Sequence, residues 1–165
     1  MARKCFYSFH YKPDNWRVAQ VKNMGAVEGQ PIVSGNTWEE VKKGGDAAIQ
    51  KWIDSNLHGR SCVIVLVGAT TANRRWVKYE IKKGWDDGMG VLGVRIHNLL
   101  DREQRRSVAG PGPFAGFTVG TSKKPLSTWA KLYDPPYTDS QKVYGYIADN
   151  LESWVGTAIK LRNSV

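Results

Sequence analysis

Two neighbouring stretches decide the fold: the apolar run CVIVLVG (Cys62–Gly68) and, after a gap of four residues, NRRWVKYEI (Asn73–Ile81). An apolar run of this length, without alternating polar residues, predicts a strand that is buried on both faces, as in parallel sheets. The second stretch predicts a helix whose first turns carry Arg75, Trp76 and Glu80. Ligands of open parallel sheets bind beyond the carboxyl ends of the strands. This stretch therefore places a carboxylate, a large aromatic ring and basic groups at the edge where a charged ligand would bind.

The rest of the chain alternates between expected strands and expected helices. Further strands are expected at Cys5–Phe9, Val91–Ile96 and Ala130–Tyr133, and Gly25–Ser34 is a weak strand-and-loop region. Apolar residues at helical spacing predict helices over residues 14–25, 37–56, 75–85 and 143–159. Such alternation is typical of a parallel sheet that is covered by helices on both faces. At 165 residues the chain is long enough for one domain and too short for two independent ones.

Local signals indicate where two of these helices begin and where one is weak. Asp14 is expected to cap the first helix, because a side-chain oxygen at this position accepts from free backbone amides. Thr37, followed three residues later by Glu40, matches the capping-box pattern. Gly44 and Gly45 lie inside the second predicted helix and are expected to weaken or break it.

The charge of the chain bounds its partners. A formal net charge of +9 favours anionic partners such as a phosphate-bearing metabolite, a nucleic acid or an acidic surface. The basic pairs are scattered and are not interleaved with aromatic residues. A solvated basic surface explains them equally well, so nucleic-acid binding is disfavoured.

The cysteines and the hydropathy indicate a cytoplasmic protein. Cys5 and Cys62 both fall in expected core strands, where reduced, buried thiols are the natural interpretation. No apolar segment approaches the roughly 20 residues that span a bilayer, and no membrane partner is expected. The start of the chain runs directly into a strand, which leaves no room for a signal peptide.

The carboxylate of Glu80 is the strongest candidate for chemistry. Helical spacing puts Val77, Ile81 and Trp85 on the core-facing stripe and Glu80 at its margin. A half-buried carboxylate there could accept hydrogen bonds from ligand hydroxyls and stabilise developing positive charge. The structural alternative is an ion pair within the helix, between Glu80 and Lys83.

The end of the first strand supplies a second group of candidates. Phe6 and Tyr11 could stack on a base or a pyridinium ring, while Ser8 and His10 could bind hydroxyls or phosphates. Core packing is the alternative for Phe6. Arg17, in the following helix, could reach a phosphate or could simply be exposed.

Several common site types are absent from the sequence. No strand is followed by GxGxxG and there is no P-loop, which disfavours an ordinary dinucleotide-binding enzyme or NTPase. The three histidines lack metal-ligand spacing, and Ser8 fits no Ser/His/Asp order. A receiver domain would need paired acids after the first strand, and none occur there.

With these motifs in place, the chain resembles the TIR domain family, whose Trp-Cys-x-x-Glu-Leu element is matched by WVKYEI at Trp76–Ile81. It is more similar to the TIR-like ThsB proteins of bacterial Thoeris anti-phage systems. Their shared pattern includes a start like FYSFHY, a Trp-Glu helix opening, an RRWVxYEI run and a Gly-Pro-x-Pro-Phe loop, here at Phe6–Tyr11, Trp38–Glu39, Arg74–Ile81 and Gly110–Phe114. The chain departs from the broader TIR pattern at Val77, where Cys is usual, and at Arg74, where Ser is frequent.

The resemblance implies a single flavodoxin-like domain over residues 1–165, with a central parallel sheet of about five strands. It implies cleavage of the nicotinamide–ribose bond of NAD, with Glu80 as the catalytic residue, and formation of a cyclic ADP-ribose isomer that signals to an effector protein. NAD is then the substrate, with no separate cofactor and no metal. The expected substrate-binding residues are Phe6, Ser8, His10, Tyr11, Arg17, Asn36, Trp38, Arg75 and Trp76.

The same resemblance implies a homo-oligomer when active and a phage-derived trigger. Two other functions stay open. One is a non-catalytic TIR-like module that docks a partner protein through the same surface. The other is a flavodoxin-like domain that binds nucleic acid through its basic face.

Overall fold

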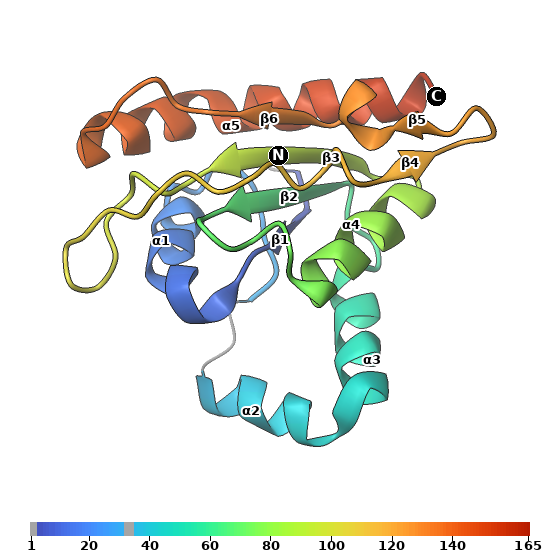
Figure 1. Ribbon diagram of the computed structural model, residues 1–165, viewed down its shortest axis with the longest axis horizontal. Helices are drawn as coiled ribbons and strands as arrows, with labels where there is room; N and C mark the ends of the chain where they lie inside the picture. The colour runs from blue at the N-terminus through green and yellow to red at the C-terminus, as the bar shows by residue number, and fades with distance from the viewer. Residues whose placement is uncertain (1–2, 32–34) are drawn as a thin grey trace.

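The computed structural model describes residues 3–31 and 35–165, and of residues 35–37 only the backbone. Within these ranges the central sheet has four parallel strands in the order β1-β2-β3-β6: β1 (Cys5–Ser8), β2 (Cys62–Val67), β3 (Gly90–Arg95) and β6 (Lys131–Tyr133) (Figure 1). The expected α/β architecture with a parallel central sheet is confirmed.

Helices cover both faces of this sheet. They are α1 (Tyr11–Asn23), α2 (Gly35–Lys43), α3 (Gly45–Leu57), α4 (Arg75–Asp86) and α5 (Ser140–Asn163). A short hairpin of β4 (Thr118–Val119) and β5 (Lys124–Pro125) and a 3-10 turn, η1 (Leu126–Thr128), precede β6. Figure 1 shows α5 lying along one side of the sheet, with α3 and α4 on the other side. No helix in the described ranges has an apolar span long enough to cross a membrane.

The central strand β2 divides the core into two halves. Every residue of β2 is buried, as its apolar run predicts. Because side chains alternate along a strand, Ile64 and Leu66 join the cluster with α1 and α5, while Val63 and Val65 join the cluster with α3 and α4. Cys5 and Cys62 are paired across β1 and β2 and are both free, buried thiols, as expected.

The outer edge of β1 differs from the expectation of a fifth strand. Within the described part of the weak region, residues 25–31, only an isolated parallel bridge joins Glu28 to Lys4. Beyond it, the Gln30 side chain takes the place of a strand: its amide accepts from the Tyr7 backbone N–H and donates to the Tyr7 carbonyl, both at 2.8 Å. Residues 32–34 lie outside the described part of the chain.

This connectivity places a crevice at the carboxyl end of β1. The chain leaves β1, returns along its outer edge at Glu28, and then crosses to β2 on the inner edge. Connections that leave neighbouring strands in opposite directions open a crevice, and ligands of open α/β sheets bind there.

Two helix boundaries differ from their predictions. The first helix begins at Tyr11 with His10 at its cap position, so the capping role expected of Asp14 is wrong. Asp14 is instead buried in the first turn and pairs with Arg17. The second predicted helix is divided into α2, which ends at Lys43, and α3, which begins at Gly45. The φ of +78° at Gly45 suits glycine, so the break expected at Gly44 and Gly45 is confirmed. The Thr37 side chain, which carried the capping-box prediction, lies outside the described residues.

Candidate active site

A cavity of about 710 Å³ opens at the carboxyl end of β1. Its floor comes from β1 and the beginning of α4, and α2 and α3 contribute its outer wall. In Figure 1 α2 stands away from the sheet, below the carboxyl end of β1. The lining residues are Phe6, Tyr7, Phe9, His10, Tyr11, Lys12, Asn15, Gln30, Pro31, Trp38, Glu39, Lys42, Trp52, Arg74, Trp76, Val77 and Glu80.

Glu80 lies in this cavity and is only 8% exposed. It is held there because Val77 and Ile81, on the adjoining face of α4, are buried against the sheet. The Ser8 hydroxyl donates a hydrogen bond of 2.6 Å to Glu80 Oε1. The alternative pairing with Lys83 is wrong, since Lys83 forms an ion pair of 3.1 Å with Asp87 on the solvent side of the helix.

Burial controls the charge of Glu80. Removal from water raises the pKa of this carboxyl to about 8, and the hydrogen bond from Ser8 opposes the rise. The free protein therefore holds Glu80 mostly protonated at neutral pH. A cationic group bound beside it would favour the carboxylate form, since opposite charges lower the pKa of an acid.

The raised pKa predicts a pH-dependent cost to stability. The folded protein keeps the proton on Glu80 up to about pH 8, whereas the unfolded chain releases it near pH 4.5. The stability that the buried, neutral side chain contributes is therefore fully present below about pH 4.5 and is lost as the pH rises to about 8. Glu80→Gln removes the titration. We expect it to leave the melting temperature nearly unchanged at about pH 5 and to stabilise the protein by on the order of 4 kcal/mol at about pH 9. Thermal denaturation of both proteins across this range measures the difference, and an equal offset at every pH would contradict the raised pKa.

Aromatic rings form the walls around Glu80. Phe6, Tyr11, Trp38 and Trp76, four of the expected substrate-binding residues, line the cavity. Trp52, from α3, adds a further ring and meets Trp38 edge-on, with ring centroids 5.5 Å apart. Rings in this arrangement can stack on a flat heterocycle.

His10 lies on the same wall, where β1 passes into α1. Its Nδ1 is 2.9 Å from the Thr70 hydroxyl in the loop after β2. Burial, and then the nearby charges of Arg74 and Lys12, lower the pKa of His10 and so favour the neutral ring. A neutral imidazole can both donate and accept hydrogen bonds.

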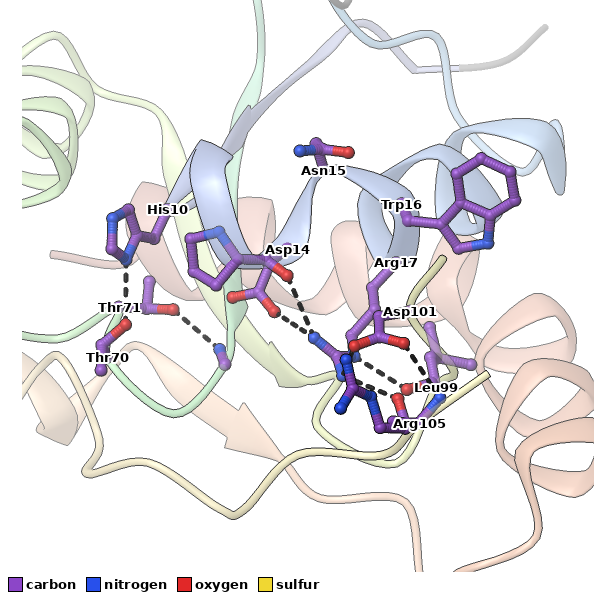
Figure 2. A network of polar contacts seen from close by, with 12 residues as sticks. His10, Asp14, Asn15, Trp16, Arg17, Thr70, Thr71, Leu99, Asp101 and Arg105 are labelled. Atoms are coloured by element: carbon purple, nitrogen blue, oxygen red, sulfur yellow. Dashed lines mark hydrogen bonds and ion pairs between the residues drawn. The ribbon is translucent and has the colours of Figure 1, made fainter. Parts of the chain in front are cut away.

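Arg17 does not line the cavity. The expectation that it contacts a phosphate is wrong, because its guanidinium is occupied by groups of the protein. Its guanidinium donates to the carbonyls of Leu99 and Arg105, at 2.8 and 2.9 Å, and to Asp14 at 2.9 Å. Figure 2 shows Arg17 turned toward the loop of Leu99, Asp101 and Arg105, away from His10. The residue fastens the loop after β3 to α1, because one planar guanidinium satisfies several carbonyls at once.

The expectation that Arg75 contacts the substrate is also not supported by its position. Arg75 extends into solvent with 67% of its side chain exposed, pairs with Asp46 at 2.8 Å and covers the Trp76 ring. Arg74, one residue earlier, lines the cavity in its place. The side chain of Asn36, another predicted contact, lies outside the described residues.

A pair of matched substitutions separates the two arginines. Arg17→Met leaves the buried Asp14 without its charge partner and frees the loop of Leu99, so we expect unfolding to become easier by about 3 kcal/mol. Arg75→Met removes an exposed ion pair and an exposed contact with the Trp76 ring, and it should change stability by about 1 kcal/mol or less. Urea denaturation of the two variants measures the difference. Equal losses would show that the Arg17 network does not hold the loop.

Several lining residues were not predicted from the sequence. Lys42 could have been found, since it follows Trp38 by four residues on the same face of α2. Trp52 falls on the apolar stripe of the helix predicted over residues 37–56, so nothing in the sequence distinguishes it from a core residue. Lys12 and Asn15 also line the cavity, and nothing in the sequence marks them. Gln30 is equally unmarked, because only the path of residues 25–31 brings it to the cavity.

No group of three or more His, Cys, Asp or Glu side chains that could hold a metal ion occurs in the part of the chain that the structure describes.

Comparison with known proteins places the chain in a family. The family model described as "Thoeris protein ThsB, TIR-like domain" matches residues 6–101, which include every residue that lines the cavity. The chain belongs to the ThsB TIR-like family. This ThsB-family chain is also 30% identical to "Putative cyclic ADP-D-ribose synthase ThsB1" of Bacillus cereus (strain MSX-D12), in an alignment that covers 94% of this chain and all of that protein. The resemblance inferred from the motifs is confirmed.

Proposed function

We propose that this protein is an enzyme of a Thoeris-type anti-phage system that cleaves the nicotinamide–ribose bond of NAD and closes the remaining ADP-ribose into a cyclic isomer. The observation that carries the proposal is the buried Glu80 carboxyl within an aromatic-walled cavity at the carboxyl end of the sheet. The relative from Bacillus cereus, named as a cyclic ADP-D-ribose synthase, supports the same reaction.

The chemistry requires little beyond binding and charge. The glycosidic bond breaks with both electrons passing to the pyridinium nitrogen, so nicotinamide leaves as a neutral molecule and needs no proton. The ribose becomes positively charged, and a carboxylate at Glu80 stabilises that charge and accepts hydrogen bonds from the ribose hydroxyls. Binding of the cationic nicotinamide ring beside Glu80 favours the charged form that this step needs.

The walls of the cavity suit the rest of the substrate. Lys12, Lys42 and Arg74 lie around the same cavity and give the diphosphate a basic surrounding. The aromatic rings of Trp38, Trp52 and Trp76 provide flat faces for the two heterocycles. A single cavity of this size then holds both ends of the dinucleotide.

Water decides the product. A nucleophile of the ADP-ribose folded back onto the anomeric carbon forms the new bond there and loses its proton, which closes the ring. A water molecule that arrives first gives linear ADP-ribose instead. The largely aromatic walls restrict water around the ribose, which favours ring closure.

The remaining parts of the proposal concern the system around the enzyme. We propose that the cyclic product activates an effector protein, that a phage-derived trigger starts the reaction, and that the active form is a homo-oligomer.

The test is incubation of the protein with NAD, with and without lysate of phage-infected cells. Chromatography follows nicotinamide release, and mass spectrometry distinguishes a cyclic product from linear ADP-ribose, which is heavier by one water. We expect equal amounts of nicotinamide and cyclic product. A folded protein that releases no nicotinamide under either condition would instead indicate a non-catalytic interaction module.

A further inference from the structure

The hydrogen bond between Ser8 and Glu80 joins two distant parts of the chain. The residues are 72 positions apart, and the Ser8 hydroxyl lies 2.6 Å from Glu80 Oε1. Ser8 has no exposed surface and is not among the residues that line the cavity. The expectation that its hydroxyl binds the ligand is therefore replaced by a contact with the carboxyl behind the cavity wall.

Both ends of this hydrogen bond are fixed by the fold. Ser8 is the last residue of β1 and is paired with Val65 of β2, so the parallel ladder sets the position of its hydroxyl. Glu80 is on α4, whose buried residues Val77 and Ile81 pack against the same sheet. No other hydrogen bond to the Glu80 carboxyl is present among the side chains that the structure describes. Ser8 is thus the group that selects how this carboxyl is turned.

We propose that Ser8 is a positioning residue for the NAD reaction, whose hydroxyl turns the Glu80 carboxyl toward the cavity and favours its charged form without touching the substrate. This inference rests on the proposed function.

The hydrogen bond from Ser8 is the main influence that opposes the effect of burial on the pKa of Glu80. The titratable residues that line the same cavity, from β1, α1, α2 and the two connecting loops, are Tyr7, His10, Tyr11, Lys12, Glu39, Lys42 and Arg74. On α4 itself, Lys83 is engaged by Asp87. Burial raises the pKa of Glu80, and the hydrogen bond from Ser8 is the influence that lowers it. A donated hydrogen bond has this effect because it is stronger to the charged carboxylate than to the neutral carboxyl.

Removal of the hydroxyl therefore has a defined consequence. In Ser8→Ala the pKa of Glu80 should rise by about one further unit. At neutral pH the charged fraction then falls by about tenfold, and kcat/KM falls with it. Because kcat/KM reports ionisations of the free enzyme, its inflection moves to higher pH, and the deficit shrinks once the pH exceeds the new pKa.

Two matched variants separate this role from substrate contact. Ser8→Cys keeps the shape and supplies a weaker donor, so it should shift the inflection in the same direction by a smaller amount. Tyr11→Phe removes a hydroxyl from the cavity wall itself. It should lower kcat/KM by a factor that is the same at every pH below the range in which tyrosine ionises.

The closing experiment reads the carboxyl directly. The pKa of Glu80 is measured by NMR of protein labelled with ¹³C at the glutamate side-chain carboxyl, with the signal assigned by its loss in Glu80→Gln. Nicotinamide release is measured against pH for the same proteins. The inference predicts a higher pKa in Ser8→Ala, a smaller rise in Ser8→Cys, and parallel shifts of the kcat/KM profile.

Two outcomes would overturn the inference. One is an unchanged Glu80 pKa in both Ser8 variants. The other is a lower kcat/KM with an unmoved inflection, which is the behaviour of a substrate contact. If Ser8→Ala does not fold, Ser8→Cys decides by the same readouts. A raised Glu80 pKa in Ser8→Ala, in a protein that releases no nicotinamide, would support the contact between Ser8 and Glu80 but contradict the proposed function. Failure of the inference and failure of the proposed function are thus distinguishable.

Discussion

Glu80→Gln is expected to lower the rate of nicotinamide release by about a thousandfold or more. Glutamine has the same shape and can still accept a hydrogen bond from Ser8, but it carries no negative charge for the developing ribose cation. Because Glu80 is nearly buried, its charge acts across a short path of low polarity, where it is worth most. Chromatography of nicotinamide under single-turnover conditions measures the loss.

The control for this variant is Glu39→Gln. Glu39 lines the same cavity, yet its carboxylate is exposed and pairs with Lys42 at 3.0 Å. The same chemical change there should alter the rate by less than about threefold, since solvent screens the charge of this exposed carboxylate. Circular dichroism confirms that both variants are folded. Equal losses in the two variants would mean that Glu80 has no special part in the reaction.

Gly90→Ala should destabilise the protein by about 3 kcal/mol. Gly90 begins β3 beneath α5, and a Cβ at this position would lie 2.7 Å from the Ile159 nitrogen and 2.8 Å from the Ala158 carbonyl carbon. These are backbone atoms, so no side-chain rotation relieves the overlap, and the whole helix must move outward. The apolar contacts between α5 and the sheet weaken as a result.

Gly145→Ala tests the same helix in the opposite direction. Gly145 lies within α5, and an added Cβ meets open space. Alanine there should stabilise the protein by about 0.5–1 kcal/mol, since glycine is the poorer helix former. Urea denaturation of both variants measures the two signs. A Gly90→Ala protein as stable as the wild type would show that α5 can move away from β3 without cost.

The elements with the strongest local patterns were predictable. The unbroken apolar run of β2 and the helical spacing of α4 both appear in the structure within a residue or two of their predicted bounds. The position of Glu80 followed from the same spacing, since its neighbours Val77 and Ile81 had to face the core. The break in the second predicted helix followed from Gly44 and Gly45, since glycine is a poor helix former.

Features that depend on long-range packing were not predictable. Arg17 is a residue type that often binds phosphate. Only the path of the loop around Leu99 shows that backbone carbonyls occupy its donors. Arg74 and Arg75 are equivalent by sequence, and the exact turn of α4 decides which of them lines the cavity. The pairing of Ser8 with Glu80 joins residues that no local pattern relates.

The most direct measurement is a crystal structure of the Glu80→Gln variant with NAD bound. The proposal predicts the nicotinamide riboside end among the aromatic walls, with the introduced glutamine side chain at hydrogen-bonding distance from the ribose hydroxyls and Ser8 still bonded behind it. NAD bound elsewhere on the protein, or seated in the cavity with its ribose out of reach of the substituted side chain, would contradict it.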